Sequence, residues 1–354
     1  MRKYWYRRFL LVLLVLSILG YAGYEITKRQ EQGRKKEVSA DTVSSDTVIP
    51  GGMPVGIYLE TEGVMVLATE KITGADGKMT EPARHLVKAG DYIVECNGKK
   101  IADKKRLQDT LKKLDAEEVV LKLRRDSGYL DVKIKPVRNK KNQYMLGIWV
   151  RDNAQGLGTV TFLNTDSRFG ALGHGIHDTD TNTLMEIKDG RVYETSIRSI
   201  QKGAGGEPGG IEGIIVYNRY NVLGTIDKNT DCGIFGTLER TDNLFRNTEP
   251  VGIMATDEIK KGDAVIRCCV EGKVKEYKIR ITKTDKHTKE ENKGLEIKVT
   301  DPELLEITGG IIQGMSGAPI LQNGKIIGAV THVFVNDPRR GYGIFISNML
   351  RMSE

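Results

Sequence analysis

An unbroken apolar run opens the chain, directly after a positively charged stretch. Residues 9–20 carry no charged side chain, and four Lys or Arg residues precede them. The run is shorter than the roughly 20 apolar residues that span a bilayer, but aromatic residues such as Trp5 and Tyr21 extend it at both ends. This pattern predicts a membrane-anchor helix, a signal anchor, over residues 1–24; a cleaved signal peptide is the alternative.

Residues 25–47 lack a hydrophobic pattern. They are charged at first and then rich in Ser, Thr and Asp, a composition typical of a flexible linker. Exposed linkers are also the usual sites of proteolytic cutting. We therefore expect this segment to tether the rest of the chain to the anchor.

From residue 48 onwards, short hydrophobic segments alternate with turns, which predicts a mainly β chain. Residues 48–137 form a first module, with strand segments at both ends and a short helix over residues 82–89. Asp103 is a suitable N-cap for a second helix that runs to Leu114.

The second module, residues 145–354, contains a strong hairpin signal. Two hydrophobic segments flank Asn323 and Gly324, the preferred pair for a two-residue type I′ turn. A turn of small residues stands immediately before them: Gly314, Met315, Ser316, Gly317, Ala318 and Pro319.

Ser316 is the candidate nucleophile of this turn. A serine attacks an acyl carbon only if its hydroxyl projects from a tight turn and nearby amides receive the developing charge. Glycine at 314 and 317 permits positive φ, so the amides of Gly314 and Ser316 can converge as an oxyanion hole. An ordinary turn of small residues is the alternative interpretation.

A serine of normal pKa needs a base, and the chain offers five histidines. His85 belongs to the first module and His287 to a charged turn, so neither suits this role. His332 follows the hairpin and is better placed to line a specificity pocket or to pack. His174 and His177 remain, and the glycines on both sides of His174 suit a side chain presented from an irregular turn.

The two histidines, with Asp178 and Asp180, also resemble a metal site. However, the glycines beside His174 disfavour the helix on which a zinc-protease motif places its ligands. We therefore expect no metal and no other cofactor. A metalloprotease and a pair of surface-loop histidines stay open as alternatives.

Composition narrows the choice of function. The chain of 354 residues is long enough for two domains. Its net charge is +7, but residues 1–37 contain nine Lys or Arg against three Glu, so most of the excess flanks the apolar run. The nearly neutral remainder lacks the basic surface of a nucleic-acid-binding protein. The four cysteines form no disulfide framework, and none lies in a presented turn.

The order of nucleophile turn, hairpin and following strand resembles the C-terminal barrel of chymotrypsin-like serine proteases. In that fold the strand after the hairpin pairs with substrate, here through Thr331, His332 and Val333. From the turn around His174 to this strand, the sequence is similar to the SpoIVB peptidase family (sporulation stage IV protein B). The resemblance implies a PDZ module followed by a chymotrypsin-like double β-barrel.

The resemblance also assigns a catalytic triad. It implies that His174 is the general base, Asp301 the acidic member and Ser316 the nucleophile. The role of Asp301 depends mainly on the family, because the sequence alone also offers other aspartates: Asp178, Asp180, Asp231 and Asp337.

Residues 90–98, a Gly-Asp turn leading to an Asn-Gly hairpin, resemble a PDZ signature. A PDZ fold binds a peptide terminus or strand by adding it to a sheet edge. Gly51, Gly52 and Met53 are the candidate peptide-binding loop. A purely structural module is the alternative.

The family resemblance implies a membrane-associated serine endopeptidase that cleaves itself and a membrane-bound regulator of an intramembrane protease. That cleavage would trigger regulated intramembrane proteolysis and late sigma-factor activation in sporulation. The enzyme would be anchored on the extracytoplasmic side, secreted from the forespore into the intermembrane space and released by self-cleavage. Expected partners are protein substrates, PDZ ligands and the membrane, but not nucleic acid. A non-catalytic, membrane-tethered PDZ adaptor is the alternative from another class.

Overall fold

The computed structural model describes residues 47–114, 118–241 and 243–353. The chain divides into two units, residues 1–43 and residues 44–354. The predicted anchor and all of the predicted linker except Thr47 lie outside the described residues. Within the described part of the chain, no helix is long and apolar enough to cross a membrane.

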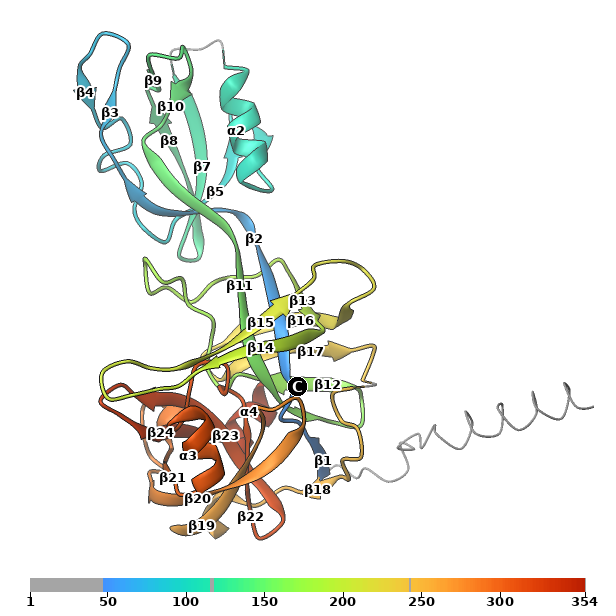
Figure 1. Ribbon diagram of the computed structural model, residues 1–354. Helices are drawn as coiled ribbons and strands as arrows, with labels where there is room; N and C mark the ends of the chain where they lie inside the picture. Colours follow the sequence, from blue (N-terminus) through green and yellow to red (C-terminus); the bar gives the residue numbers. More distant parts are fainter. Residues whose placement is uncertain (1–46, 115–117, 242, 354) are drawn as a thin grey trace, which may run out of the picture. The chain divides into compact units, whose positions relative to one another are not determined.

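A first barrel is formed by a ring of strand pairs. The order is β11-β12-β17-β16-β13-β2, and β2 pairs with β11 to close the ring (Figure 1). Two further strands, β1 and β18, extend from β11. The bounds are β1 (Thr47–Pro50), β2 (Pro54–Thr69), β11 (Ile148–Leu163), β12 (Arg168–Ala171), β13 (Asp189–Tyr193), β16 (Val222–Thr230), β17 (Gly233–Leu238) and β18 (Val251–Gly252).

A second closed barrel follows, in the order β19-β20-β21-β24-β23-β22. Its strands are β19 (Gly262–Cys269), β20 (Val274–Thr284), β21 (Leu295–Val299), β22 (Pro319–Gln322), β23 (Lys325–Phe334) and β24 (Asp337–Phe345). Alternate residues of β20, Tyr277, Ile279 and Ile281, are about 1% exposed and fill the interior. The predicted pair of barrels is therefore present.

The predicted hairpin turn is confirmed between β22 and β23. Gln322 pairs with Lys325, and Asn323 and Gly324 between them have φ of 52° and 75°. Two positive φ values are what a type I′ turn requires. The turn places β23 directly after the strand that leaves Ser316.

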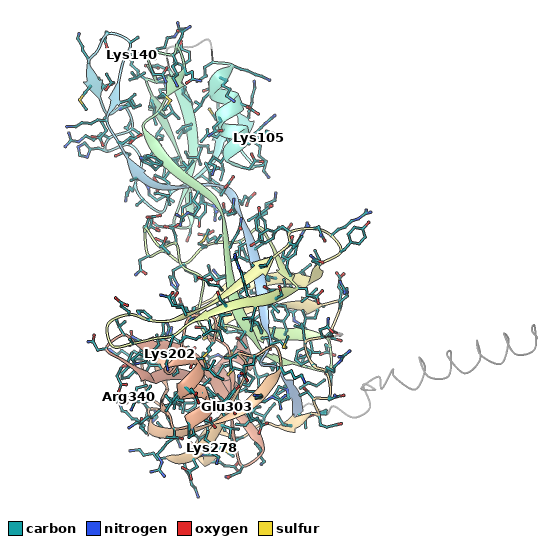
Figure 2. All side chains as sticks on the ribbon, viewed as in Figure 1. Lys105, Lys140, Lys202, Lys278, Glu303 and Arg340 are labelled. Carbon is teal, nitrogen blue, oxygen red and sulfur yellow. The ribbon has the colours of Figure 1, made fainter. Side chains whose placement is uncertain are left out.

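A smaller module is inserted between β2 and β11. Its apolar core includes Val64, Ile93, Leu121 and Ile134, and charged side chains such as Lys105 and Lys140 lie on its surface (Figure 2). Its elements are β3 (Ile72–Thr73), β4 (Met79–Thr80), β5 (Tyr92–Cys96), β6 (Lys99–Lys100), α2 (Lys104–Lys112), β7 (Val119–Arg125), β8 (Gly128–Ile134), β9 (Val137–Arg138) and β10 (Tyr144–Met145).

The two helices predicted for this module have different outcomes. Asp103 is the N-cap of α2, and its carboxylate accepts a hydrogen bond from the Arg106 amide at 2.6 Å, as predicted. Residues 82–89 instead form turns, and His85 has a φ of 61°. With this left-handed φ, His85 cannot be part of a right-handed helix.

Strand pairing moves the boundary predicted between the two modules. Residues 54–60 of β2 pair with residues 153–159 of β11, and part of the same segment pairs with β13. Residues 54–60 therefore belong to the first barrel, and β1 pairs with its strand β11, although the sequence placed both in the first module. The smaller module is an insertion between two strands that each run for 16 residues.

The loop predicted to bind peptide also lies in the barrel wall. The amides of Gly51 and Gly52 donate to the carbonyls of Thr161 and Val160 at 2.8 and 2.9 Å. A Cβ on Gly51 would lie 2.1 Å from the Val160 oxygen. Because both amides are already bonded to β11, the assignment of residues 51–53 as a carboxylate-binding loop is wrong.

The remaining elements surround the second barrel. The hairpin of β14 (Thr195–Gln201) and β15 (Gly210–Ile215) reaches the nucleophile turn, because Ile211 donates to Gln313 and Gln313 donates to Gly209, at 2.8 and 2.9 Å. The others are η2 (Thr256–Glu258), η3 (Glu291–Lys293), α3 (Pro302–Thr308) and α4 (Ile346–Ser353).

Candidate active site

Ser316 lies in the turn between α3 and β22. Strand β11 donates hydrogen bonds to the carbonyls of this turn. The Thr159 hydroxyl donates to the Gly314 carbonyl at 2.7 Å, and the Thr159 amide donates to the Ser316 carbonyl at 2.9 Å. The Thr161 hydroxyl donates to the Gly317 carbonyl at 2.7 Å. Both threonines are at most 2% exposed. Three carbonyls of the turn are therefore fixed toward the first barrel.

The amides of the turn are used differently. Met315 donates to the Ile312 carbonyl at 3.1 Å and Gly317 to the Val330 carbonyl at 2.8 Å. Among the hydrogen bonds of the described residues, none uses the amide of Gly314 or Ser316. Gly314 has a φ of 97°, which an L side chain rarely adopts. The two amides predicted to form an oxyanion hole are thus available as donors.

His174 stands in a loop after β12 that packs against β23. A Cβ on Gly173 would lie 3.0 Å from the Thr331 methyl group, so the backbones approach closely here. The Nδ1 atom of His174 lies 2.9 Å from the Gly175 carbonyl oxygen. Because a carbonyl only accepts, Nδ1 carries the proton and Nε2 is left as the basic nitrogen.

Burial lowers the pKa of His174 below its ordinary value, and the neighbouring His177 acts in the same direction. The hydrogen bond to Gly175 works against this shift. The imidazole is therefore neutral at neutral pH, the form that a general base needs.

The serine and the histidine contact adjacent residues of β23. The Ser316 hydroxyl donates to the Thr331 carbonyl at 2.8 Å. The ring of the next residue, His332, lies against the His174 ring with centroids 4.9 Å apart. In this arrangement the Ser316 proton points to Thr331, so its transfer to His174 requires the hydroxyl to turn away from that carbonyl.

His332 is a neutral neighbour of the base. Burial, followed by the charges of His174 and Lys293, lowers its pKa to about 4. Its Nδ1 atom is buried without a hydrogen-bond partner among the described residues. His332 therefore contributes ring contact and no positive charge at neutral pH.

The strand predicted to pair with substrate has an irregular register at this point. Val330 pairs with Gly343 and Val333 with Gly341, which leaves a bulge between the two pairs. The Thr331 hydroxyl donates to the Asn292 carbonyl at 2.7 Å. The role of Thr331, His332 and Val333 in substrate pairing stays a prediction.

Asp301 lies at the start of α3 and acts as its N-cap. Its carboxylate accepts hydrogen bonds from the amides of Lys278, Glu303 and Leu304 at 3.0 to 3.2 Å. No hydrogen bond or ion pair among the described residues joins it to His174. Its role as the third triad member stays a prediction that this arrangement does not display.

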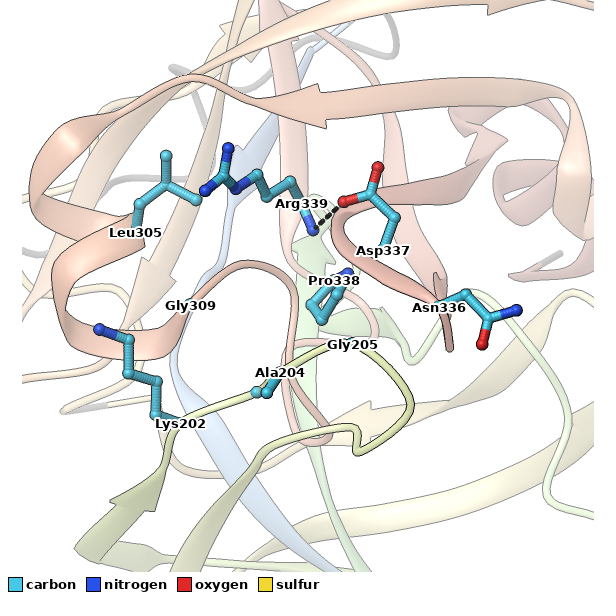
Figure 3. A pocket seen from close by; sticks show the side chains of 10 residues that line it. Lys202, Ala204, Gly205, Leu305, Gly309, Asn336, Asp337, Pro338 and Arg339 are labelled. Atoms are coloured by element: carbon cyan, nitrogen blue, oxygen red, sulfur yellow. Dashed lines mark hydrogen bonds between the residues drawn. The ribbon is translucent and has the colours of Figure 1, made fainter.

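A small cleft of about 200 Å³ opens beside His174. It lies between β11 and the His174 loop, and its lining includes Gln155, Leu157, Leu172 and His177. A larger cavity of about 370 Å³ lies elsewhere, between the loop at Lys202 and the turn at Arg339, where the Arg339 amide donates to Asp337 (Figure 3). The smaller cleft is the one that His174, the candidate base, lines.

The inserted module has a free strand edge that the sequence did not reveal. Residues 148–151 of β11 pair with β2 on one side, and no described strand pairs with their other side. Helix α2 lies next to this segment, since the Lys104 amide donates to Asp152 at 2.7 Å. Trp149 is 57% exposed here. Such an edge can accept a peptide strand.

Comparison with known proteins decides the family. The chain matches the family described as SpoIVB peptidase S55 over residues 142–350, more than half of its length. The chain belongs to this family. It is a serine peptidase, and the non-catalytic alternative does not describe it. No curated protein matches the sequence.

Several solved structures show slight similarity to this peptidase. The PDZ domain of an SdrC-like protein from Listeria monocytogenes has 21% identity and a TM-score of 0.21, with coverage of 25% of this chain and 87% of its own. The active form of the Rv3671c protease from M. tuberculosis has 14% identity, a TM-score of 0.31 and coverage of 56% and 74%. The HtrA-type protease AlgW with a decapeptide has 13% identity, a TM-score of 0.32 and coverage of 56% and 51%. These values are too low to support an argument, so the assignment depends on the family match.

Proposed function

We propose that Ser316 and His174 carry out peptide hydrolysis through an acyl-enzyme. The Ser316 oxygen bonds to the scissile carbonyl carbon while its proton moves to His174 Nε2. The resulting oxyanion accepts hydrogen bonds from the amides of Gly314 and Ser316. The C–N bond then breaks, His174 returns the proton to the leaving amine, and water repeats the sequence to release the acid.

The observation that carries this proposal is the arrangement of the nucleophile turn. Its carbonyls are bonded to Thr159 and Thr161, and the amides of Gly314 and Ser316 have no partner among the described residues. Donors fixed before the reaction stabilise a developing charge without reorganisation. The carbonyl of Gly175 accepts a hydrogen bond from Nδ1 of His174, and this bond favours the imidazolium that forms after the serine proton reaches Nε2.

We propose further that the enzyme acts on a membrane-bound regulatory protein and on its own linker, on the extracytoplasmic side of a membrane. The anchor pattern of residues 1–24 and the family's sporulation name support this proposal. By the same resemblance, the cleavage would release an intramembrane protease and activate a late sigma factor. The inserted module would bind a peptide strand at the free edge of β11.

Self-cleavage tests this proposal with the full chain. Membranes that contain the parent chain should yield a shortened, released fragment, and membranes that contain Ser316→Ala or His174→Ala should yield none. Ser127→Ala, an exposed change in the turn between β7 and β8, is the matched control and should cleave like the parent. Equal fragmentation in parent and Ser316→Ala chains would contradict the proposal.

A further inference from the structure

The loop that carries His174 is held at several points after the histidine. Asn229 on β16 bonds to both ends of the segment 176–185. Its side chain accepts a hydrogen bond from the Ile176 amide and donates to the Ile176 and Met185 carbonyls, each at 2.9 Å. Ile176 and Met185 also pack with Met65 and Tyr92 of the inserted module. The base therefore stands on a loop that contacts both the first barrel and the insertion.

A buried carboxylate organises the tip of this loop. The side chain of Asp178 is 0% exposed. One of its oxygens accepts hydrogen bonds from the amides of Asp180 and Thr181 at 3.0 and 2.9 Å and from the Thr181 hydroxyl at 3.1 Å. A buried carboxylate needs a compensating cation, because an isolated charge in a protein interior is costly.

Arg151 of β11 supplies that cation. Its guanidinium donates to the second oxygen of Asp178 and also pairs with Asp180 at 2.7 Å. One terminal nitrogen of the guanidinium contacts the buried carboxylate of Asp178, and the other contacts the exposed carboxylate of Asp180. Both aspartates of the metal-site alternative are thus paired with Arg151.

The position of Arg151 on β11 links the insertion to the active site. Its neighbour Val150 packs against the core of the inserted module. A register break separates Arg151 from Asn153, where β11 enters the first barrel. Further along the same strand, Thr159 and Thr161 fix the nucleophile turn. One strand therefore touches the supports of both the base and the nucleophile.

We propose that Arg151 is a positioning residue for His174, acting through Asp178. The proposal rests on the role of His174 as the general base. The guanidinium of Arg151 fixes the loop at Asp178, four residues after His174. The same loop contributes His174 and His177 to the lining of the small cleft. Catalysis then depends on the packing of the insertion against the first barrel, because Arg151 lies where the two meet.

Labelling of Ser316 by a fluorophosphonate probe tests this proposal in the full chain. The probe needs an activated serine but no knowledge of the natural substrate. We expect Arg151→Ala to lower the labelling rate by about 10- to 100-fold, the effect of a misplaced catalytic group. Arg191→Ala is the control. It removes an arginine of β13 that is 50% exposed and paired with Asp189, and this variant should label within about twofold of the parent.

Two further variants separate positioning from folding. Loss of Arg151 alone leaves a buried charge, so the chain with Arg151→Ala can fail to fold. Combining Arg151→Met with Asp178→Asn removes both charges; we expect this chain to fold, by circular dichroism, and still to label slowly. Millimolar guanidinium should raise the rate of Arg151→Ala and leave that of the double variant unchanged.

The outcomes distinguish this proposal from the proposed function. If His174→Ala labels at the parent rate, His174 is not the base and the mechanism fails. If His174→Ala is inactive but the folded double variant labels like the parent, the mechanism stands and the role of Arg151 is overturned.

Discussion

At the scale of single residues, the environment of His174 predicts the pH dependence of the enzyme. Only the neutral imidazole accepts the serine proton, so activity falls as the pH is lowered through the pKa of His174. Burial holds this pKa below its ordinary value, and the acid limb of the labelling rate should have its midpoint below about 6.5, the unperturbed value for histidine. His332→Phe is the control: His332 is neutral above a pH of about 4, so the midpoint should not move. A midpoint at or above the ordinary value would show that the base is not buried as described.

At the scale of elements, the start of α3 tests the role of Asp301. Asparagine is as good an N-cap as aspartate, whereas alanine in place of a cap costs about 0.5–2 kcal/mol. As a cap, Asp301→Asn should retain labelling within a few-fold, and Asp301→Ala should mainly lower the free energy of unfolding. If Asp301 orients His174 during catalysis, Asp301→Asn should instead reduce the rate by about 10⁴-fold. Denaturant unfolding and probe labelling of the three chains decide between the two roles.

A second prediction at this scale concerns the hydrogen bond from Thr161 of β11 to the nucleophile turn. Thr161→Val keeps the shape of the side chain but leaves the Gly317 carbonyl without its donor. An unsatisfied buried acceptor costs about 1–3 kcal/mol, and the freed turn should label more slowly. Thr161→Ser restores the hydroxyl and should recover most of the rate. Equal rates in the valine and serine variants would mean that this bond does not hold the turn.

At the scale of the whole molecule, the features that were predicted correctly from a few neighbouring residues are short-range, and the long-range ones could not be predicted. The helix expected over residues 82–89 is a short-range prediction that failed, because His85 has a φ of 61°. The Asn323-Gly324 turn and the Asp103 cap are set by a few neighbouring residues, and both were predicted correctly. Thr159 and Thr161 lie more than 150 residues before the turn that they hold, so no spacing in the sequence indicates them. The start of the insertion was misplaced because β2 runs as one strand from the first barrel into the insertion, and only its pairing with distant strands shows which part belongs to which. Arg151 was missed for the same reason as the threonines: its partners are brought close only by the fold.

The most direct test of the central claim is the rate at which the fluorophosphonate probe labels the full chain. If a neutral His174 activates Ser316 beside the free amides of Gly314 and Ser316, the parent should be labelled at Ser316, and His174→Ala should lose the labelling although it remains folded. Labelling that persists unchanged in His174→Ala, or that falls on another residue of the parent, would contradict the account.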